Sequence, residues 1–347
     1  MKALVYQGPG KISLEDKPKP QLEKPTDCIV KILRTTICGT DLHIMKGDVP
    51  TVISGRTLGH EGVGIIEAVG NGVSNFHVND KVLISCITCC GKCSYCKNKM
   101  YSHCEVGGWL LGHKIDGTQA EYVRIPYADT SLHPLPPEVD EEVAVMFSDI
   151  LPTGFETGVL KGQIKLGDTV AIIGAGPVGL AALLTAQFYS PANIFVVDLD
   201  GHRLEMAKRL GATAIVNGSS DRAVETIMSL TQNKGVNVAI EAVGNRSAFD
   251  ICQSIIAPGG FIANVGVHGT SVDFHLEKLW DRNITLTTAL VDTYSIPTLL
   301  TTFKNGKLKP ERLITHHFDL KDILKAYEVF KDAAHQNALK VILKNQH

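Results

Sequence analysis

The sequence has no long run of charged residues of one sign. Its 34 basic and 36 acidic residues are interspersed, and the formal net charge is -2. Nothing in this balance favours nucleic acid or another polyanion as a partner. Internal repeats, low-complexity tracts and flexible linkers are also missing, so disorder is not indicated. With 347 residues, 44% of them hydrophobic, the chain can bury a substantial core and is expected to form two domains.

Apolar runs long enough for export or membrane insertion are missing as well. The first ten residues, MKALVYQGPG, reach glycine and proline before an apolar core develops, so no secretory signal is expected. The long apolar stretch Val170–Leu184 is short for a membrane span and is interrupted by three glycines and a proline. A strand, a turn and a helix explain it better. We therefore expect a cytoplasmic protein without a membrane partner.

Cysteine is plentiful but unevenly distributed, with six of nine cysteines between Cys86 and Cys104. An odd total in a chain without an export signal favours metal ligation over disulfides. Within this region the pattern C-x2-C-x2-C-x7-C is formed by Cys90, Cys93, Cys96 and Cys104. Four thiolates on a short lobe can enclose a tetrahedral zinc ion with no open position, as a structural site requires.

An iron–sulfur cluster and a redox-active C-x-x-C pair are the alternatives for this cluster. Its spacing differs from that of ferredoxins, and a thioredoxin-like context is missing around it. A redox-sensing zinc module is a further alternative, which predicts thiol reactivity and no turnover. Cys86 and Cys89 are left over, and Cys89 is expected to be a small loop residue without a metal.

The pattern of apolar and turn-forming residues changes along the chain. This change predicts an α/β protein with a β-rich first domain. Residues 1–150 offer short β-like runs separated by Gly, Pro, Asn and Asp clusters. Residues 151–289 alternate strands with helices, which predicts a doubly wound parallel sheet. Residues 290–347 do not continue this alternation of strands and helices, and they are expected to return to the first domain. The predicted strands of the first domain include Cys28–Leu33, Gly62–Val69 and Lys81–Ser85.

The second and third segments give the following expected elements. The predicted strands are Thr169–Ile173, Ile194–Asp198, Ala214–Val216, Val236–Ala242, Gly260–Val265 and, near the end, Leu339–Leu343. The predicted helices are Thr153–Leu160, Gly201–Leu210, Arg222–Thr231, Ser247–Ile256, Ile296–Asn305 and Lys321–Ala334.

A glycine-rich turn follows the strand Thr169–Ile173. Gly174-Ala-Gly176-Pro-Val-Gly179 gives the pattern G-x-G-x-x-G at the opening of a helix. Gly174 permits the tight turn, Gly176 lets the backbone approach a pyrophosphate, and Gly179 lets the helix pack closely on the sheet. This context predicts a dinucleotide-binding fold.

The next strand ends in Asp198, about twenty residues beyond the turn. A carboxylate there suits a ribose 2′-hydroxyl and repels a 2′-phosphate, so NAD is favoured over NADP. The neighbouring Arg203 leaves NADP open. The alternative is an ordinary strand–helix turn with Asp198 as a surface residue.

Two further segments of the first domain carry residue types that bind metals. They are Cys38-Gly-Thr40-Asp-Leu-His43 and Gly59-His60-Glu61-Gly62. Taken singly, each residue is ordinary, because a lone cysteine is usually a small buried hydrophobe and a lone histidine a satisfied polar residue. These residues alone therefore do not assign a metal.

In order and combination, the motifs resemble those of the zinc-containing medium-chain alcohol dehydrogenases over nearly the whole chain. The resemblance is carried by Cys38-Gly-Thr-Asp41, Gly59-His-Glu-Gly-Val-Gly64, the Cys90–Cys104 cluster and the Gly174–Gly179 turn. It implies a GroES-like catalytic domain, a Rossmann domain and an active site in the cleft between them. The implied reaction is reversible hydride transfer between a primary or secondary alcohol and NAD, giving an aldehyde or ketone.

The resemblance also implies the ligands of a catalytic zinc ion. Cys38 and His60 are expected as the first two ligands, and Glu61 resembles the acidic residue that can approach the metal. The third ligand is expected to be Asp149, where many relatives have a cysteine. Aspartate is a competent zinc ligand and is similar to the choice made in bacterial tetrameric secondary-alcohol dehydrogenases.

Further roles follow from the same resemblance. Thr40 resembles the hydroxyl that takes the proton of the alcohol, and His43 the histidine that passes it toward solvent. Val178 is expected behind the nicotinamide ring and the turn Val265-Gly266-Val267 near its carboxamide. Cys86 is expected on the wall of the substrate pocket, where a small residue makes room for branched or secondary alcohols.

The implied cofactors are two zinc ions and NAD per chain. The implied partners are a small alcohol or carbonyl substrate and further copies of the chain, with a tetramer favoured over a dimer. The alternatives are a polyol, sugar or threonine-type amino-alcohol dehydrogenase, and a metal-free quinone reductase-like or structural relative. The presence of Cys38, His60 and Asp149 together speaks against the metal-free relative.

Overall fold

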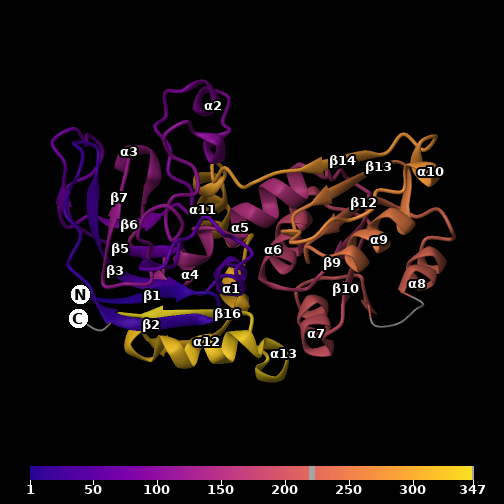
Figure 1. Cartoon of the computed structure of the whole chain (residues 1–347). Coiled ribbons are helices and arrows are strands. Elements are labelled where there is room, and N and C mark those ends of the chain that lie inside the picture. The colour runs from indigo at the N-terminus through magenta and orange to yellow at the C-terminus, as the bar shows by residue number, and fades with distance from the viewer. Residues whose placement is uncertain (219–222, 346–347) are drawn as a thin grey trace. The chain divides into compact units, whose positions relative to one another are not determined.

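The computed structural model describes residues 1–218 and 223–345 and separates into two compact units (Figure 1). The first unit consists of Met1–Asp149 and Asp292–His347, and the second of Ile150–Val291. The sequence predicts divisions after residues 150 and 289, and the structure divides after 149 and 291.

The second unit is built on a six-stranded sheet in which every pair of neighbours is parallel. The strand order is β11-β10-β9-β12-β13-β14. Because the central strands are covered on both sides, they are continuously apolar, and Val170–Ile173 are at most 3% exposed. The strands are β9 (Thr169–Ile173), β10 (Asn193–Asp198), β11 (Ala214–Asn217), β12 (Val236–Glu241), β13 (Ile256–Asn264) and β14 (Thr285–Thr288).

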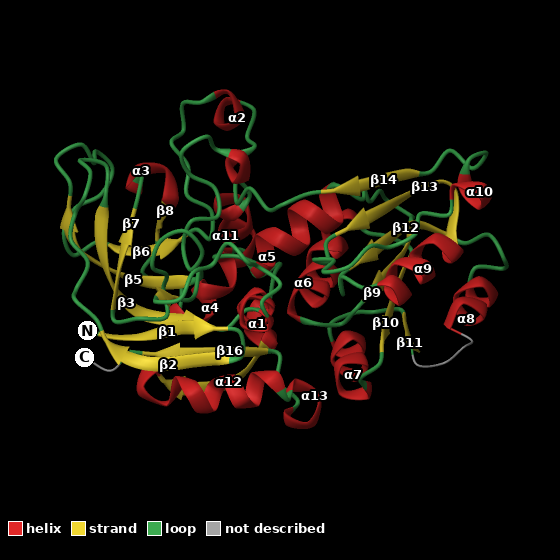
Figure 2. Cartoon of the chain, in the orientation of Figure 1, coloured by secondary structure: helices red, strands yellow, loops and turns green. Residues whose placement is uncertain are grey.

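Helices connect and cover these strands, as Figure 2 shows in red. They are α5 (Ile150–Thr153), η3 (Gly154–Leu160), α6 (Pro177–Ala186), η4 (Gln187–Tyr189), α7 (Gly201–Arg209), α8 (Ala223–Leu230), α9 (Arg246–Ile255) and α10 (Leu276–Leu279). Asp200 and Asn245 cap α7 and α9 by accepting backbone N–H bonds. The predicted α/β class is confirmed.

Several predicted boundaries of this unit need correction. The helix expected over Thr153–Leu160 is instead α5 followed by the π-helix η3, whose Gly154 packs so closely on α6 that a Cβ would lie 2.6 Å from the Ala182 nitrogen. Strand β13 begins at Ile256 rather than Gly260, so the predicted end of the preceding helix is extended chain. Arg222, the predicted start of another helix, lies outside the described residues.

The first unit contains a three-stranded and a seven-stranded sheet. Most of its strand pairs are antiparallel, and β15–β16 are parallel. The smaller sheet consists of β1 (Lys2–Gly8), β2 (Lys11–Asp16) and β4 (Arg56–Thr57). The larger one consists of β3 (Cys28–Thr36), β5 (Gly62–Val69), β6 (Lys81–Ile84), β7 (Tyr122–Ile125), β8 (Leu132–Pro134), β15 (Ile314–Asp319) and β16 (Lys340–Lys344).

The C-terminal segment completes the first unit, since β16 pairs with β3. Figure 1 shows yellow β16 and α12 beside the indigo strands of the N-terminus. Leu4, Tyr327 and Val341 share one buried core there. The helix predicted over Lys321–Ala334 is broken at Asp332. The elements are α11 (Ile296–Lys304), η5 (Pro310–Leu313), η6 (Leu320–Asp322), α12 (Ile323–Lys331) and α13 (Ala333–Gln336).

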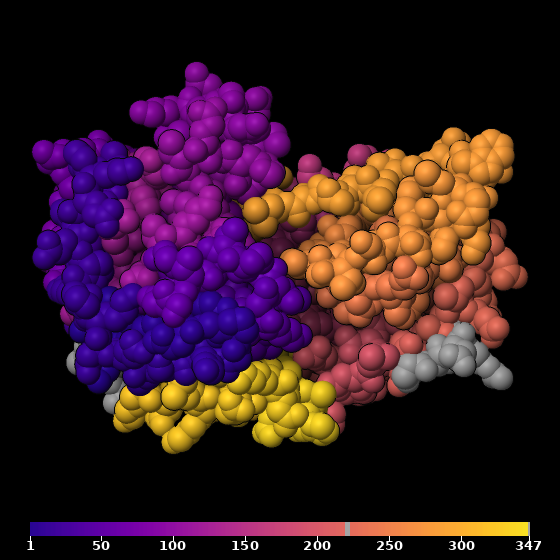
Figure 3. Space-filling view, in the orientation of Figure 1, coloured from indigo at the N-terminus to yellow at the C-terminus, as the bar shows by residue number. Residues whose placement is uncertain are grey.

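The remaining helices of the first unit are short and belong to its loops. The lobe that carries α2 projects from the rest of the unit in Figure 3. Among the described helices, the run Glu141–Leu160 is long and apolar enough to cross a membrane, but 83% of its apolar window is buried inside the protein, as in a core helix. The helices are α1 (Gly39–Lys46), α2 (Ser94–Lys97), η1 (Tyr101–His103), α3 (Ala128–Ser131), α4 (Glu141–Ala144) and η2 (Val145–Phe147).

Candidate metal centres and cofactor site

The first unit brings four metal-binding side chains together at a buried point. One ligand atom from each lies within 4.8 Å of the others, and the four residues are Cys38, His60, Glu61 and Asp149. Asp149 Oδ2 lies 3.2 Å from His60 Nε2 and 3.6 Å from Cys38 Sγ. Sulfur, nitrogen and oxygen atoms that converge in this way form a donor set that zinc accepts. The residues therefore fit a zinc ion.

A chain of buried hydrogen bonds fixes the backbone of Cys38, which precedes α1. Asp41 Oδ2 accepts from the Cys38 nitrogen at 2.9 Å and from Gln119 Nε2 at 2.9 Å. The Tyr327 hydroxyl of α12 in turn donates to Gln119 Oε1 at 2.8 Å. Asp41, Gln119 and Tyr327 are each at most 1% exposed, so these bonds are shielded from competing water.

Local backbone geometry places His60 and Asp149. Gly59 has a φ of +90°, and a Cβ there would lie 2.6 Å from the Gln119 side chain, so the turn before His60 requires glycine. The Ser148 hydroxyl accepts from the Gly62 nitrogen at 3.1 Å. This bond ties the segment of Asp149 to the start of β5.

Burial and mutual proximity shift the pKa values of these side chains. Burial raises the pKa of Cys38, and the nearby Asp149 carboxylate adds to the rise. Burial opposes the charged form of His60, but hydrogen bonds to Asp149 and Cys38 outweigh it, so the pKa of His60 is raised. Each group thus holds a proton more tightly than it would in water. A divalent cation held by these side chains would supply the positive charge in place of those protons.

Glu61, the fourth member of the cluster, forms an ion pair with Lys340 of β16. Lys340 Nζ lies 2.8 Å from Glu61 Oε1 and 2.9 Å from Oε2, and both side chains are 1% exposed. Burial raises the pKa of Glu61 to about 7, while Lys340 opposes this rise. Burial would lower the pKa of Lys340, but Glu61 and Cys38 outweigh it and leave it raised. Breaking such a buried pair by removing one partner costs about 3–5 kcal/mol.

The expected proton-relay residues both lie on α1. Thr40 Oγ1 is 3.6 Å from Cys38 Sγ, a member of the candidate metal-binding group. His43 Nδ1 is 2.8 Å from Asp48 Oδ2, and its side chain is 30% exposed. Because residues three apart share a helix face, α1 presents Thr40 and His43 on the same side.

Cys86, expected on the substrate pocket wall, contacts a metal-binding residue. Its Sγ lies 3.7 Å from Asp149 Oδ1, the carboxylate oxygen that does not face His60. The thiol is buried. Cys86 therefore borders the metal set without belonging to the group of four.

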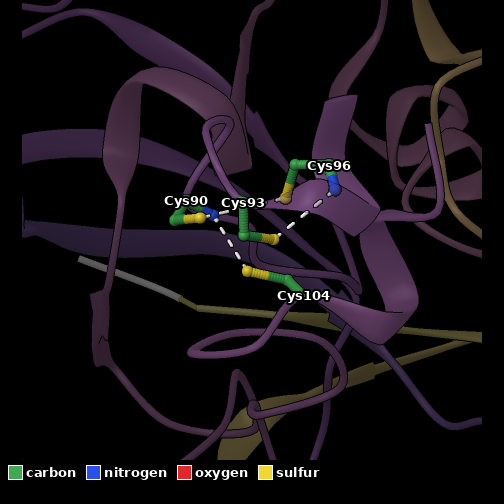
Figure 4. Close-up of side chains that lie close together, drawn as sticks. All are labelled: Cys90, Cys93, Cys96 and Cys104. Carbon is green, nitrogen blue, oxygen red and sulfur yellow. Dashed lines mark hydrogen bonds between the residues drawn. The ribbon is translucent and has the colours of Figure 1, made fainter. Parts of the chain in front are cut away.

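The four cysteines of the projecting lobe form the second metal-binding group (Figure 4). The Sγ atoms of Cys90 and Cys96 are 3.9 Å apart, and Cys104 Sγ accepts from the Cys90 nitrogen at 3.2 Å. Backbone N–H groups of Cys96 and Glu105 lower the pKa of Cys93 to about 6. Four converging thiols with this backbone support fit a closed structural zinc ion.

Cys89 lies beside this group but is not a member of it. It packs on Cys96 and Cys104, and its Sγ is 3.6 Å from the Thr130 carbonyl oxygen. Burial raises the pKa of Cys89, so its thiol is held in the neutral form.

The glycine turn of the second unit fits a pyrophosphate. Gly174 has a φ of +106°, and a Cβ on Gly179 would lie 1.9 Å from the Gly174 carbonyl oxygen. A Cβ on Gly176 would meet only Arg203 Nη1, at 4.0 Å, so the space before the N-terminus of α6 is open and faces a guanidinium. Open backbone at a helix N-terminus with a nearby cation suits an anionic group.

The other expected cofactor contacts lie around this turn. Asp198 Oδ2 accepts from the Ala175 nitrogen at 2.6 Å and Oδ1 from the Asp200 nitrogen at 2.9 Å. A carboxylate has further lone pairs, so it can also accept ribose hydroxyls. Val178 and Val265 are partly exposed, and Val267 is 58% exposed.

The sequence motifs do not point to several residues that support these sites. Lys340 lies near the start of the apolar stretch Leu339–Leu343, where a lysine suggests a solvent-facing strand position, and Gln119 and Tyr327 belong to no motif. In the second unit, buried Glu241 ties two loops together. Its carbonyl oxygen accepts from the Val265 and Gly266 nitrogens, and its carboxylate accepts from the Gly244 nitrogen. Only tertiary structure brings such partners together.

Comparison with known proteins places this fold and these donor sets in one class. Residues 24–137 match the model of the alcohol dehydrogenase GroES-like domain, and residues 177–305 match the zinc-binding dehydrogenase model. An alcohol dehydrogenase of Cupriavidus necator is 35% identical over 365 aligned residues, covering 99% of this chain and 98% of its own. The class is that of the zinc-binding dehydrogenases.

Solved structures agree with this class. A zinc-dependent alcohol dehydrogenase from Streptococcus pneumonia, in its apo form, has 56% identity and a TM-score of 0.96 over 100% of this chain and 99% of its own. An alcohol dehydrogenase of Escherichia coli solved with NADH has 27% identity and a TM-score of 0.89, covering 99% of both chains. The chain belongs to the zinc-type alcohol dehydrogenase family, as its motifs predict.

Proposed function

We propose that the protein is an NAD-dependent zinc alcohol dehydrogenase that interconverts a primary or secondary alcohol and its aldehyde or ketone. The observation that carries this proposal is the buried convergence of Cys38, His60 and Asp149. Three protein ligands leave a fourth position for a substrate oxygen, as catalytic zinc sites require. A zinc ion bound there supplies Lewis acidity toward that oxygen.

The side chains around this set move the proton and orient the substrate. Thr40 lies next to Cys38 and takes the proton of the alcohol. His43, paired with Asp48 and partly exposed, passes the proton toward water. Cys86 is a small residue beside Asp149 and leaves room for a branched alcohol.

The second unit binds the cofactor in this proposal. Gly174, Gly176 and Gly179 receive the pyrophosphate at the start of α6. Asp198 binds the ribose 2′-hydroxyl and selects NAD over NADP, since a carboxylate repels a 2′-phosphate. Val178 contacts the nicotinamide, and the turn Val265-Gly266-Val267 receives its carboxamide.

Two zinc ions per chain are proposed, one for each donor set. The Cys38 set is catalytic because it leaves a position open, and the Cys90–Cys104 set is structural because four thiolates close it. The cytoplasm is the proposed location. In support, none of the nine cysteines, all of them described, forms a disulfide, as is typical of a reducing compartment.

We also propose that the enzyme is a homo-oligomer, with a tetramer favoured over a dimer. Among the described strands, β14 pairs only with β13 and therefore forms an edge of its sheet. Near this edge Trp280 is 76% exposed and Leu290 46% exposed. An unpaired edge with apolar neighbours suits pairing with a second copy. Light scattering on the wild type and on Trp280→Asp tests this, since a wild-type monomer contradicts it.

The activity is tested by following NADH absorbance with primary, secondary and polyhydroxy alcohols, each with and without a zinc chelator. We expect turnover with a simple alcohol, a preference for secondary alcohols, and loss of turnover on chelation. Faster turnover with polyhydroxy alcohols assigns the enzyme to polyol substrates instead. The proposal is contradicted if no alcohol is turned over, or if turnover persists after the metal is removed from the Cys38 group.

A further inference from the structure

The C-terminal strand β16 places a lysine beside the metal-binding cluster of the first unit. Lys340 Nζ lies 2.8 and 2.9 Å from the two carboxylate oxygens of Glu61 and 3.4 Å from the Ile37 carbonyl oxygen. An ammonium group has three N–H donors. These three acceptors therefore match the hydrogen-bonding capacity of Lys340, and both oxygens of Glu61 face it.

Glu61 nevertheless lies within reach of the metal position. One of its oxygens is within 4.8 Å of the ligand atoms of Cys38, His60 and Asp149. A carboxylate is an ordinary zinc ligand, like the imidazole and the thiolate beside it. Glu61 thus has two possible partners, the ammonium group and the metal, and it cannot turn fully to the metal without leaving a buried ammonium group unpaired.

We propose that Lys340 is a positioning residue that holds Glu61 away from the metal and so keeps the fourth coordination position available to the substrate. This inference rests on the proposed function of the Cys38 site. It gives the C-terminal segment a specific task, because β16 carries the charge that decides whether the site has three protein ligands or four. The alternative is that Lys340 only neutralises a buried charge in the core.

The test uses the full-length protein with cobalt(II) in the Cys38 site, since the visible absorption of cobalt(II) reports its ligands without turnover. In Lys340→Met we expect Glu61 to join the metal. The cobalt absorption bands weaken as a ligand is added, the metal leaves more slowly to a chelator, and KM for the alcohol rises about tenfold.

The double variant Lys340→Met/Glu61→Gln separates positioning from packing. It lacks both charges, so we expect the wild-type cobalt spectrum and KM to return. Lys340→Arg keeps the charge and is expected to keep the wild-type spectrum. The matched control is Lys344→Met on the same strand, because Lys344 is 37% exposed and pairs with Glu142.

Two results overturn the inference. The first is a Lys340→Met protein that is less stable but has the wild-type cobalt spectrum and chelator rate. The second is a spectrum that Glu61→Gln does not restore in the double variant. If Lys340→Met does not fold, Lys340→Gln takes its place, because it also removes the charge that pairs with Glu61, and the same spectra of the single and double variants then decide the question. A wild-type protein inactive on every alcohol refutes the proposed function, while these spectra still report on Lys340.

Discussion

The two metal-binding groups of the first unit differ in how they are built. The lobe takes four thiols from Cys90–Cys104, fifteen consecutive positions, and supports them with backbone N–H groups. The other group takes a thiol, an imidazole and two carboxylates from three separate segments and buries all of them, and one of the carboxylates, Glu61, is paired with Lys340. Four thiolates outweigh the charge of zinc and fill its coordination shell. One thiolate, one carboxylate and a neutral imidazole balance that charge and leave the ion electrophilic.

The largest effect is expected from Cys38→Ser, which removes a proposed ligand of the open group. Turnover is expected to fall about a thousandfold or more, because the stabilisation that the metal gives the reacting oxygen is worth several kcal/mol. Metal analysis is expected to show the lobe zinc retained. Near-wild-type turnover in this variant contradicts the division of duties between the two groups.

Cys96→Ser breaks the closed group instead. We expect the lobe to lose its zinc, the free energy of unfolding to fall by several kcal/mol, and proteases to cut near residues 90–104. Cys89→Ser is the control, because Cys89 contacts the cluster without being one of its four members. Equal zinc loss in both variants means that the group has been assigned wrongly.

Asp198→Asn changes the second unit and is expected to leave both metal groups intact. Replacing a charged acceptor of hydrogen bonds costs about 1.5–3 kcal/mol, so NADH is expected to bind about tenfold to a hundredfold more weakly. Binding of NADPH is expected to improve because the repulsion of its 2′-phosphate is removed. Fluorescence titration measures both affinities, and unchanged NADH binding refutes the role of Asp198.

Acidification is expected to produce the smallest effect and to separate the two groups by their order of zinc loss. Burial raises the pKa of Cys38, so protons compete with zinc for this thiolate at a higher pH. In the lobe, backbone N–H groups lower the pKa of Cys93 to about 6 and also lower that of Cys90, while burial raises those of Cys96 and Cys104, so protons compete at only part of its ligand set. Zinc release followed with a colorimetric chelator from pH 8 to pH 4 is therefore expected to begin at the Cys38 group. Release from the lobe first contradicts this expectation.

The same contrast explains how far the sequence predicts the structure. The parallel sheet, the glycine turn and the four-cysteine lobe are encoded locally, by strand–turn–helix order and by close spacing. Strands β5 and β9 begin and end at their predicted residues. The residues of the open group form no short sequence pattern. Cys38, His60 and Asp149 are therefore predictable only through resemblance to a family.

The rest could not be predicted because it depends on partners far apart in the chain. Lys340 and Glu61 are 279 positions apart, and Tyr327 and Gln119 are 208 apart. Neither pair belongs to a periodic pattern or a short motif. The break in the helix at Asp332 and the early start of β13 are differences in element boundaries, which residue preferences define least sharply.

The most direct test of the central claim is a metal titration that follows turnover and site occupancy together. The protein is stripped until only the lobe retains zinc, and zinc is then returned in small steps while NADH formation from a simple alcohol is recorded. We expect turnover to rise in proportion to occupancy of the Cys38 group and to level off when that group is full. Turnover already present with only the lobe filled, or unchanged as the Cys38 group fills, would contradict the account.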